Sequence, residues 1–373
     1  MANEKKPKLD EIVKLESSIG TSNRVTDDVF QVLPVGSLTT AIGDSFYGIN
    51  HRQQPGSISI NKDFYGLTFF TRPRLNLTTA NIRAVRELTP LLSGESTSIQ
   101  RIIRSLLDPE LIRRNDNGSD GRTPFVDHQQ AFIPILTNNL ISMSGWPDVT
   151  APTFTSQQGT YKEEFSIIDG LTKNYSTYDI TANFRNIPGD PITALFYYWI
   201  TYASNVYQGT IVPYSDMIIN NEVDYNTRIY RLVLDSSKRR VQKIAACGAA
   251  FPWSTPLGAA FNFESDRPLN NSNDQITINF RCMGAMYQDD ILVWEFNRTT
   301  ELFNDGLQDG KREQLYVMVP FAALGVFNNQ GYPRINQDSY ELEWWVPKDV
   351  FEERLPMYKQ FQQNTTPAPG ASN

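Results

Sequence analysis

The side chains best suited to catalysis are few in this sequence. Its 373 residues include two histidines, His51 and His128, and two cysteines, Cys247 and Cys282. Either histidine could act as a general base, and Cys247 could act as a nucleophile only with such a base beside it. No further ligand stands at metal-site spacing from a histidine. We interpret the histidines as loop residues and the cysteines as reduced thiols packed in a core.

Acidic residues form three small groups of the kind that acid–base catalysis needs. Glu163 is followed by Glu164, Asp289 is followed by Asp290, and Glu222 stands two residues before Asp224. Adjacent residues on a strand point to opposite faces, so the adjacent pairs would make poor glycosidase dyads. The sequence also lacks a phosphate-binding loop, a dinucleotide glycine fingerprint, a zinc-protease motif and a nucleophile elbow. It therefore predicts no enzyme activity, no cofactor and no metal site.

The composition is that of a folded, mildly acidic chain. Forty per cent of the residues are hydrophobic, and 34 Lys and Arg stand against 41 Asp and Glu, which gives a net charge of −7. This balance argues against a broad basic face that grips DNA. The acidic excess lies entirely in residues 151–373. The sequence also shows neither a secretory signal nor an apolar run long enough to span a membrane, and we expect a protein made in a cytoplasm.

The first 150 residues predict an arm followed by a mixed region. Residues 1–60 suggest an extended arm with a short amphipathic helix at 9–16, and a strand is expected over 63–77. Apolar residues at helical spacing predict helices over 79–114. A polar turn follows at 115–121, and 132–146 is apolar and expected to be buried.

Four arginines lie among the predicted helices, at Arg101, Arg104, Arg113 and Arg114. They could form a phosphate-binding patch. We favour a solvated helix surface, because exposed charges on a helix are the commoner case.

From residue 151 the pattern changes to strands separated by turns. Residues 161–168 and 178–187 suggest a hairpin-like pair around Asp169 and Gly170. A long helix is expected over 190–208, with Asp190 as its cap, Pro191 at its first position and Gly209 after its end. Its buried stripe would consist of Ile192, Leu195, Phe196, Trp199, Ala203 and Val206.

Further strands are expected over 227–234, 242–251, 275–287 and 291–296. Residues 300–350 suggest a short polar helix and an aromatic segment, and an exposed tail is expected from Lys359.

Two of these strands alternate apolar and polar residues, which is typical of a half-buried strand. In 275–287, Ile276, Ile278, Phe280 and Cys282 would face the core, and Thr277, Asn279 and Arg281 would face the other way. In 178–187, Ile180, Ala182 and Phe184 alternate with Asp179, Thr181 and Asn183. These two polar triads are the candidate functional residues.

The order of elements over 228–296 resembles the tail tube proteins of contractile-tailed bacteriophages and their relatives at the tube ends. In that family a strand reaches a Gly-x-Phe-Pro-Ser-like corner, which Gly248 to Ser254 matches with one residue inserted. A short strand, an Asn/Asp-rich turn at 266–274 and a long alternating strand then follow. The helix at 190–208 is similar to the single helix that flanks the tube fold. The resemblance covers roughly residues 160–300.

This resemblance implies a mainly β, α+β fold: a tail-tube-type antiparallel sandwich or ring-forming barrel with one flanking helix. The expected division is an extended arm at 1–60, a mixed additional region at 61–150, the tube-type domain at 151–300, a C-terminal extension at 301–358 and an exposed tail at 359–373.

The resemblance also implies a structural role in a virion. The chain would self-assemble into rings, hexameric by resemblance, that form or extend a tail tube through which DNA passes. Its partners would be neighbouring tube, sheath or baseplate proteins. Either Thr277, Asn279 and Arg281 or Asp179, Thr181 and Asn183 would face the lumen. The acidic excess of 151–373 could make that wall repel DNA, or it could simply be ordinary solubilising charge.

Two other functions stay open at this point. A neck, capsid-associated or baseplate-wedge protein could use a similar sandwich. The 17 Tyr, 21 Phe and 6 Trp could alternatively serve a sugar-binding host-recognition module, which would need exposed aromatic residues on a concave face. Sheet packing and subunit interfaces explain so many aromatic residues more simply.

Overall fold

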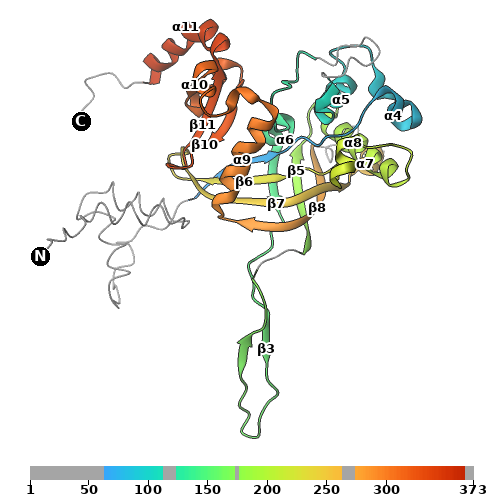
Figure 1. Ribbon diagram of the computed structural model, residues 1–373, viewed down its shortest axis with the longest axis vertical. Helices are drawn as coiled ribbons and strands as arrows, with labels where there is room; N and C mark the ends of the chain where they lie inside the picture. Colours follow the sequence, from blue (N-terminus) through green and yellow to red (C-terminus); the bar gives the residue numbers. More distant parts are fainter. Residues whose placement is uncertain (1–62, 112–122, 173–175, 263–273, 366–373) are drawn as a thin grey trace, which may run out of the picture.

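The centre of the molecule is one six-stranded antiparallel sheet with the strand order β1-β6-β7-β8-β5-β2. The computed structural model describes residues 63–111, 123–172, 176–262 and 274–365. The sheet curls into a half-barrel (Figure 1). Its strands are β1 (Phe64–Phe70), β2 (Leu140–Ser144), β5 (Thr177–Arg185), β6 (Ile229–Leu234), β7 (Val241–Ser254) and β8 (Gln275–Tyr287).

Two smaller sheets accompany the main sheet. β3 (Thr153–Thr155) and β4 (Ser166–Ile168) form a narrow arm that projects far from the rest of the molecule (Figure 1). β9 (Tyr316–Val319), β10 (Tyr332–Ile335) and β11 (Leu342–Pro347) form a three-stranded sheet near the C-terminus. The observed architecture, mainly antiparallel β with several helices, confirms the predicted fold class. The main sheet curls rather than stacking face to face on a second large sheet.

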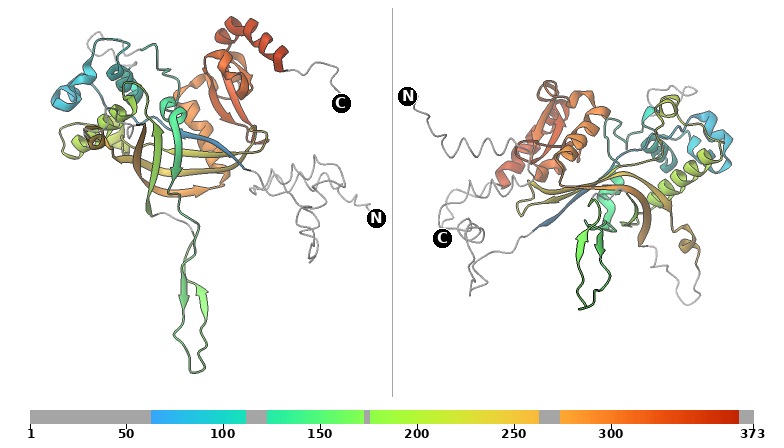
Figure 2. Two further views of the ribbon diagram at one scale, coloured as in Figure 1. Left: turned by 180° about the vertical axis from the view of Figure 1, so that it is seen from behind. Right: turned by 60° about the horizontal axis from the view of Figure 1, so that its bottom comes forward.

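The helices gather in two groups on the side of the sheet away from the arm (Figure 2). One group holds α4 (Thr79–Ala84), η2 (Arg86–Leu92), α5 (Ile99–Leu107), η3 (Pro109–Leu111), α7 (Pro191–Tyr207) and α8 (Ser215–Asn220). The other holds α9 (Asp290–Phe303), η7 (Asp305–Leu307), α10 (Arg312–Leu315), η8 (Phe321–Phe327) and α11 (Lys348–Thr365). Between them stands α6 (Pro134–Asn139), and η5 (Leu257–Phe261) follows β7. No helix in the described ranges is both long and apolar enough to cross a membrane.

Each helical group closes a hydrophobic core against the sheet. The first core packs α5 and α7 on β5 and β8, around the fully buried Phe184, Phe196 and Phe280. The second packs α9 and the three-stranded sheet on β6 and β7, around Phe296. Phe69 and Phe70, neighbours in β1, belong to different cores. β1 therefore ties both cores to one sheet.

Several predicted strands lie where they were expected. The strand at 275–287 is β8, and those at 227–234, 242–251 and 178–187 correspond to β6, β7 and β5. The expected helices over 79–114 appear as α4, η2, α5 and η3 up to residue 111. The turn expected at 115–121 and the whole of the arm expected at 1–60 lie outside the described residues.

The predicted strand at 291–296 is wrong, because this segment is the first half of α9. Asp289 caps the helix, since its Oδ1 accepts a hydrogen bond from Ile291 N at 3.0 Å. Leu292, Val293 and Phe296 point into the second core at helical spacing. A six-residue apolar run fits a strand or a buried helix equally well, so the short window was misleading.

The predicted hairpin of 161–168 with 178–187 is also wrong. β4 pairs with β3, which precedes it in the chain, whereas β5 pairs with β8 and β2. The turn at Asp169 and Gly170 therefore does not join two paired strands.

The two arginines of α5 fit neither a phosphate-binding patch nor a solvated helix surface, the two interpretations offered for the predicted arginine cluster. Arg101 and Arg104 are 4% and 1% exposed, so neither forms a solvated surface or an open phosphate patch. Arg104 donates from Nε and Nη2 to the carbonyl oxygen of Leu77 at 3.1 and 2.8 Å. Arg113 and Arg114 lie outside the described residues.

The long helix α7 begins and ends as expected but is capped differently. Asp190 has a left-handed backbone (φ 49°) and makes no side-chain capping bond. Tyr198 and Tyr202 join its buried residues, whereas the expected Ala203 and Val206 are half-buried, and Val206 packs on the first core. α9 also packs on the sheet, so the single flanking helix expected from the resemblance is an underestimate.

The main sheet draws its strands from more than one of the predicted segments. The main sheet takes β1 and β2 from the region before residue 151, so the division at 150/151 stays a prediction about domains. The tail expected from Lys359 is corrected in its first residues, because α11 continues to Thr365 and Phe361 packs on the second core.

Candidate functional site

The two predicted polar triads lie side by side on one face of the main sheet. β5 and β8 are antiparallel neighbours whose register places Asp179 opposite Arg281, Thr181 opposite Asn279 and Asn183 opposite Thr277. The sequence presented the triads as alternatives, 98 residues apart. The structure joins them into one surface, which we call the polar ladder: Asp179, Thr181, Asn183, Thr277, Asn279 and Arg281.

The two residues of each cross-strand pair in the polar ladder are joined by a side-chain contact. Thr181 Oγ1 donates to Asn279 Oδ1 at 3.0 Å, and Thr277 Oγ1 donates to Asn183 Oδ1 at 2.7 Å. Arg281 Nε lies 2.9 Å from Asp179 Oδ1, and the Arg281 guanidinium lies over the Trp253 ring at 5.9 Å. Cross-strand pairs of this kind fix strand register.

Two serines that the sequence reasoning missed extend the ladder to the neighbouring strands. Asn183 Nδ2 donates to Ser142 Oγ of β2 at 2.8 Å, and Asn279 Nδ2 donates to Ser254 Oγ of β7 at 3.1 Å. The polar band therefore crosses four strands. Neither serine carries a distinctive sequence signal, because each becomes a partner only through strand pairing.

The opposite side of the same strands is fully apolar. Ile180, Ala182, Phe184, Ile278 and Phe280 are completely buried, as the alternation predicted. The sheet therefore has one face that packs and one face that water can reach.

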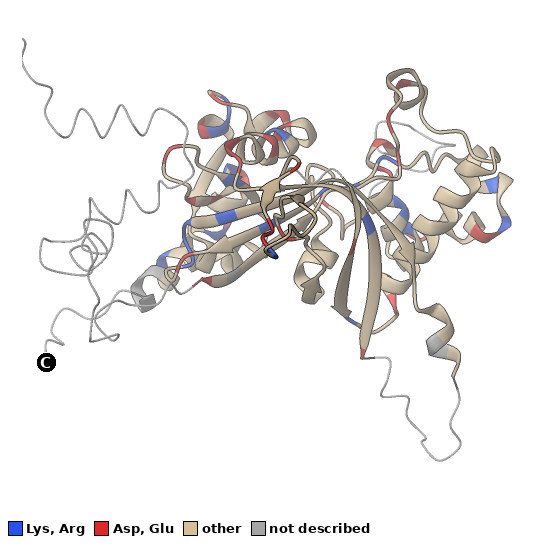
Figure 3. Ribbon diagram, turned by 90° about the horizontal axis from the view of Figure 1, so that it is seen from below, with Lys and Arg blue, Asp and Glu red and all other residues tan. Residues whose placement is uncertain are grey.

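The polar ladder is close to electrically neutral, which corrects the idea that the acidic excess coats this face. Its single carboxylate, Asp179, is paired with its single cation, Arg281. Elsewhere on the face, Arg231 donates to Gly66 O at 2.9 Å and Lys243 forms an ion pair with Asp63. Seen from below, the strands are mainly uncharged, and acidic residues lie chiefly in the surrounding segments (Figure 3).

The fold places the described candidate catalytic side chains in a core and in a loop. Cys247 and Cys282 are buried core thiols, and Cys247 Sγ accepts a hydrogen bond from Ile229 N at 3.1 Å. The hydrogen bond with Cys247, together with burial, raises the pKa of Cys282 and keeps that thiol neutral. His128 is a loop residue, and its backbone carbonyl oxygen accepts a hydrogen bond from Arg72 Nη1 at 3.4 Å. His51 lies outside the described residues.

Four carboxylates from the three acidic groups of the sequence have structural partners. Asp289 caps α9, Asp290 accepts from the Tyr340 hydroxyl, and Glu163 Oε2 accepts from Tyr161 N at 2.8 Å. Asp224 is buried beside Tyr202, whose hydroxyl donates to it, and burial raises the pKa of Asp224. Across the described ranges, no three His, Cys, Asp or Glu residues lie together in a way that could hold a metal ion.

The main sheet ends in two open edges. Among the described residues, β1 pairs with β6 alone and β2 with β5 alone. The far side of β1 is contacted at its end, where Ile133 N donates to Phe70 O at 2.9 Å. Unpaired strand edges are sites where another chain can add a strand.

The β3–β4 arm carries an unusual amount of exposed apolar surface. Its large exposed residues are Phe154, Tyr161, Phe165, Ile167, Ile168 and Leu171. An isolated two-stranded hairpin is at best marginally stable, so such an arm suits contact with another molecule. Sequence reasoning missed the arm, although its strand at 161–168 was partly foreseen.

Comparison with known proteins gives one family and several structural likenesses. A family model described as "Putative phage tail tube protein" matches residues 12–360. No curated protein sequence matches significantly.

Three solved structures are similar to this chain over less than half of its length. The tube-terminating cap of the anti-feeding prophage is 16% identical, with 43% of this chain and 83% of the cap aligned at a TM-score of 0.26. A sheath/tube terminator of the extracellular contractile injection system PVC in its extended state is 14% identical, over 42% of this chain and 86% of that one, at a TM-score of 0.24. A chain of the PVC sheath–tube complex is 17% identical, over 43% and 83%, at a TM-score of 0.26.

Proposed function

Since the chain belongs to the phage tail tube protein family, we propose that it is a structural subunit that self-assembles into rings, hexameric by family resemblance, which form or extend a tail tube in the virion. Its partners would then be further copies of itself and neighbouring tube, sheath or baseplate proteins. DNA would pass through the ring without being bound in a sequence-specific way.

The observation that carries this proposal is the curled sheet with an open strand edge on each side. β1 and β2 lie at opposite ends of the strand order, so the β1 edge of one copy can meet the β2 edge of the next. Repetition of that contact by rotation closes a ring and leaves no edge unpaired. The sheet is already curved within one copy, as the sheet of a closed barrel must be (Figure 2).

The polar ladder supplies the face that would line the lumen. Hydroxyl and amide groups are uncharged, and the one ion pair cancels its own charge. A wall of this kind offers DNA phosphates no row of cations to bind. The low friction of such a wall would come from neutrality and internal hydrogen bonding rather than from an acidic lining.

The direct test is negative-stain electron microscopy of the purified chain, with mass photometry to weigh the particles. We expect rings or short tubes with a central hole, and a mass that is a whole multiple of 42.4 kDa. A monomer at all accessible concentrations would contradict self-assembly of the chain on its own.

A charge placed on the open edge tests how the ring closes. Ile141 on β2 is 47% exposed, and we expect Ile141→Lys to leave folding intact while preventing rings. The matched control is Ile219→Lys on α8, at a helical position that is 77% exposed. Equal ring formation by the two variants would show that β2 is not an edge used in assembly.

A further inference from the structure

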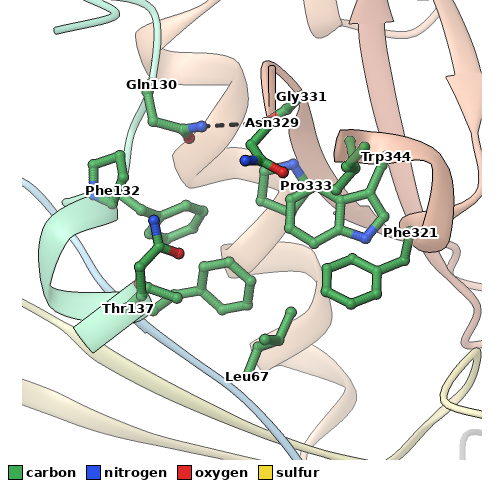
Figure 4. A pocket seen from close by; sticks show the side chains of 13 residues that line it. Leu67, Gln130, Phe132, Thr137, Phe321, Asn329, Gly331, Pro333 and Trp344 are labelled. Atoms are coloured by element: carbon green, nitrogen blue, oxygen red, sulfur yellow. Dashed lines mark hydrogen bonds between the residues drawn. The ribbon is translucent and has the colours of Figure 1, made fainter. Parts of the chain in front are cut away.

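Two cavities adjoin the main sheet. One, of about 270 Å³, lies between the main sheet and the C-terminal three-stranded sheet and is lined by four aromatic rings (Figure 4). The other, of about 390 Å³, lies over β6, β7 and the end of β8. We call the second cavity the β6–β7 groove. Its lining includes Val149, Arg231, Val233, Lys243, Ala245 and Tyr287.

The floor of the β6–β7 groove belongs to the accessible face of the sheet. Arg231 pairs with Ala245 across β6 and β7, and Val233 pairs with Lys243. Leu232, which stands between them on β6, is instead buried in the second core. Since side chains alternate along a strand, the groove residues point away from that core.

The wall of the groove is the segment that follows β2. It is held over the sheet by Tyr287, whose hydroxyl donates to Pro147 O at 2.5 Å. The Tyr287 ring also packs on that of Trp146, at 6.1 Å between centroids. Val149, in the same wall, is 65% exposed. The groove therefore has a fixed wall with an uncovered apolar side chain.

Both cations of the groove already have partners at the start of β1. Arg231 Nη1 donates to Gly66 O at 2.9 Å and to Thr68 Oγ1 at 3.1 Å. Lys243 forms an ion pair with Asp63. An occupant of the groove therefore needs no carboxylate. It needs an apolar side toward Val149 and the floor, and no net charge.

The chain enters the main sheet beside this groove. Asp63 is the first residue that the structure describes, and its partner Lys243 stands on β7, two strands in from β1. The 62 residues before Asp63 lie outside the described residues, and the family match from residue 12 includes most of them. The segment that leads into Asp63 therefore arrives at the edge of the groove.

That segment has the composition that the groove requires. Residues 57–61 are Ser-Ile-Ser-Ile-Asn, which carry no charge and alternate polar with apolar. An extended chain advances about 3.3 Å per residue, so Ile60 stands within about 10 Å of Asp63 and Ile58 within about 17 Å. Pro55 and Gly56, immediately before, are typical of a turn that ends an extended stretch.

We propose that residues 57–61 lie extended in the β6–β7 groove of their own chain. Ile60 packs near Val233 and Lys243, and Ile58 packs against Val149. Ser57 and Ser59 then face away from the sheet, so the covered groove presents hydroxyl groups as the polar ladder does. This inference concerns a single chain and does not depend on ring formation.

Cysteine cross-linking tests the docking in the full-length chain. Ile58 and Val149 are both changed to Cys, and the protein is treated with a mild oxidant; the two native cysteines are buried. We expect an intrachain disulfide, identified by mass spectrometry of the peptides. The matched control pairs Ser59→Cys with Val149→Cys. It should close about tenfold more slowly or less, because neighbouring residues of an extended segment face opposite ways.

Trypsin cleavage after Lys62 gives a second readout without cysteines. In wild type, docking should protect this bond, and Ile58→Ser combined with Ile60→Ser should speed its cleavage by about tenfold. The control variant, Ser57→Ala with Ser59→Ala, changes the opposite side of the segment and should leave the rate unchanged. Cleavage after Arg52, outside the docked segment, serves as the reference within each chain.

The outcomes separate this inference from the proposed function. Preferential closure of the 58/149 pair within one chain, with protection of Lys62, supports the docking. Equal closure of the two cysteine pairs overturns it, as does a Lys62 cleavage rate that the isoleucine substitutions do not change. Disulfides found only between chains overturn docking on the segment's own chain. Rings are scored independently by electron microscopy, so their absence beside an intact 58/149 disulfide counts against the proposed function alone.

Discussion

Asp179 and Arg281 face each other across β5 and β8, with Asp179 Oδ1 2.9 Å from Arg281 Nε. Along the same two strands, hydroxyl-to-amide hydrogen bonds join Thr181 to Asn279 and Thr277 to Asn183. This register turns two separate polar triads into one neutral surface on the accessible face of the sheet. It also fixes which residues of β5 and β8 must be apolar, because the alternating residues face the core.

The core face of β8 should not tolerate charge, whereas the polar ladder should. Phe280 is fully buried, with its ring 5.7 Å from that of Phe70 and 5.6 Å from that of Phe196. We expect Phe280→Asp to cost about 4 kcal/mol or more, enough to prevent folding, because it buries an unpaired carboxylate. Thr277→Asp on the exposed side should change stability by less than about 1 kcal/mol. Circular dichroism and urea denaturation give the comparison, and soluble, cooperative Phe280→Asp protein would refute the strand assignment. The same contrast is predicted for Ile278→Asp.

The Asp179–Arg281 ion pair should contribute little to stability. Both side chains are more than 40% exposed, so water and salt screen their attraction. A double-mutant cycle with Asp179→Asn and Arg281→Gln should give a coupling of about 0.2 to 1 kcal/mol that shrinks as salt is raised. A coupling above about 2 kcal/mol, unaffected by salt, would mean that the pair is more deeply shielded than the structure shows.

The buried Asp224–Tyr202 pair should make stability depend on pH. Tyr202 donates to Asp224, and Asn76 N donates to the Tyr202 hydroxyl oxygen at 3.0 Å. Burial raises the pKa of Asp224 above its usual 3.8, so the folded state favours the protonated acid. Its stabilising contribution is therefore complete below pH 3.8 and is lost as pH rises through the folded-state pKa.

Urea denaturation of wild type and Asp224→Asn, repeated at a series of pH values from below 3.8 to neutral, tests whether the buried acid loses stability as pH rises. The variant should gain stability relative to wild type as pH rises, by about 1.4 kcal/mol for each unit of pKa shift that it removes. Tyr202→Phe should cost about 1 to 3 kcal/mol at neutral pH, because it leaves the buried carboxylate without its donor. A wild-type to Asp224→Asn difference that does not change with pH would contradict the raised pKa.

Arg72 should be irreplaceable even by lysine. Its guanidinium donates to the carbonyl oxygens of Leu106 at 2.9 Å, Ser105, His128 at 3.4 Å and Gln130 at 3.3 Å. Burial lowers the pKa of Arg72 from 12.5 to about 10, so the group stays charged at neutral pH. We expect Arg72→Lys to cost about 2 to 4 kcal/mol, because one ammonium group cannot reach acceptors on two separate segments. Thermal unfolding measures the loss, with Arg83→Lys on the exposed face of α4 as the neutral control. Equal melting temperatures for the two variants would rule out this role.

The alternating strands were predictable from sequence because their signal is local. Gln275–Tyr287 alternates in a period of two, and that period alone places Ile278 and Phe280 inside and Thr277 and Asn279 outside. The start and stop of α7 were similarly marked by Pro191 and Gly209, residues whose backbone preferences act within one turn. The family resemblance came from the same stretch, and the family match over 12–360 confirms it.

Structural features that depend on contacts between distant segments of the chain were not predictable from the sequence. The pairing of Asp179 with Arg281, the burial of Arg104 against Leu77 and the helical state of 290–303 are each decided by segments far away in the chain. Strand register and burial are collective: a six-residue apolar run does not encode which surface it will meet. The sequence by itself thus determined which side of each long strand is polar. Only the tertiary structure decided that these sides form one continuous ladder, because strand pairing between distant segments exists only once the chain is packed in three dimensions.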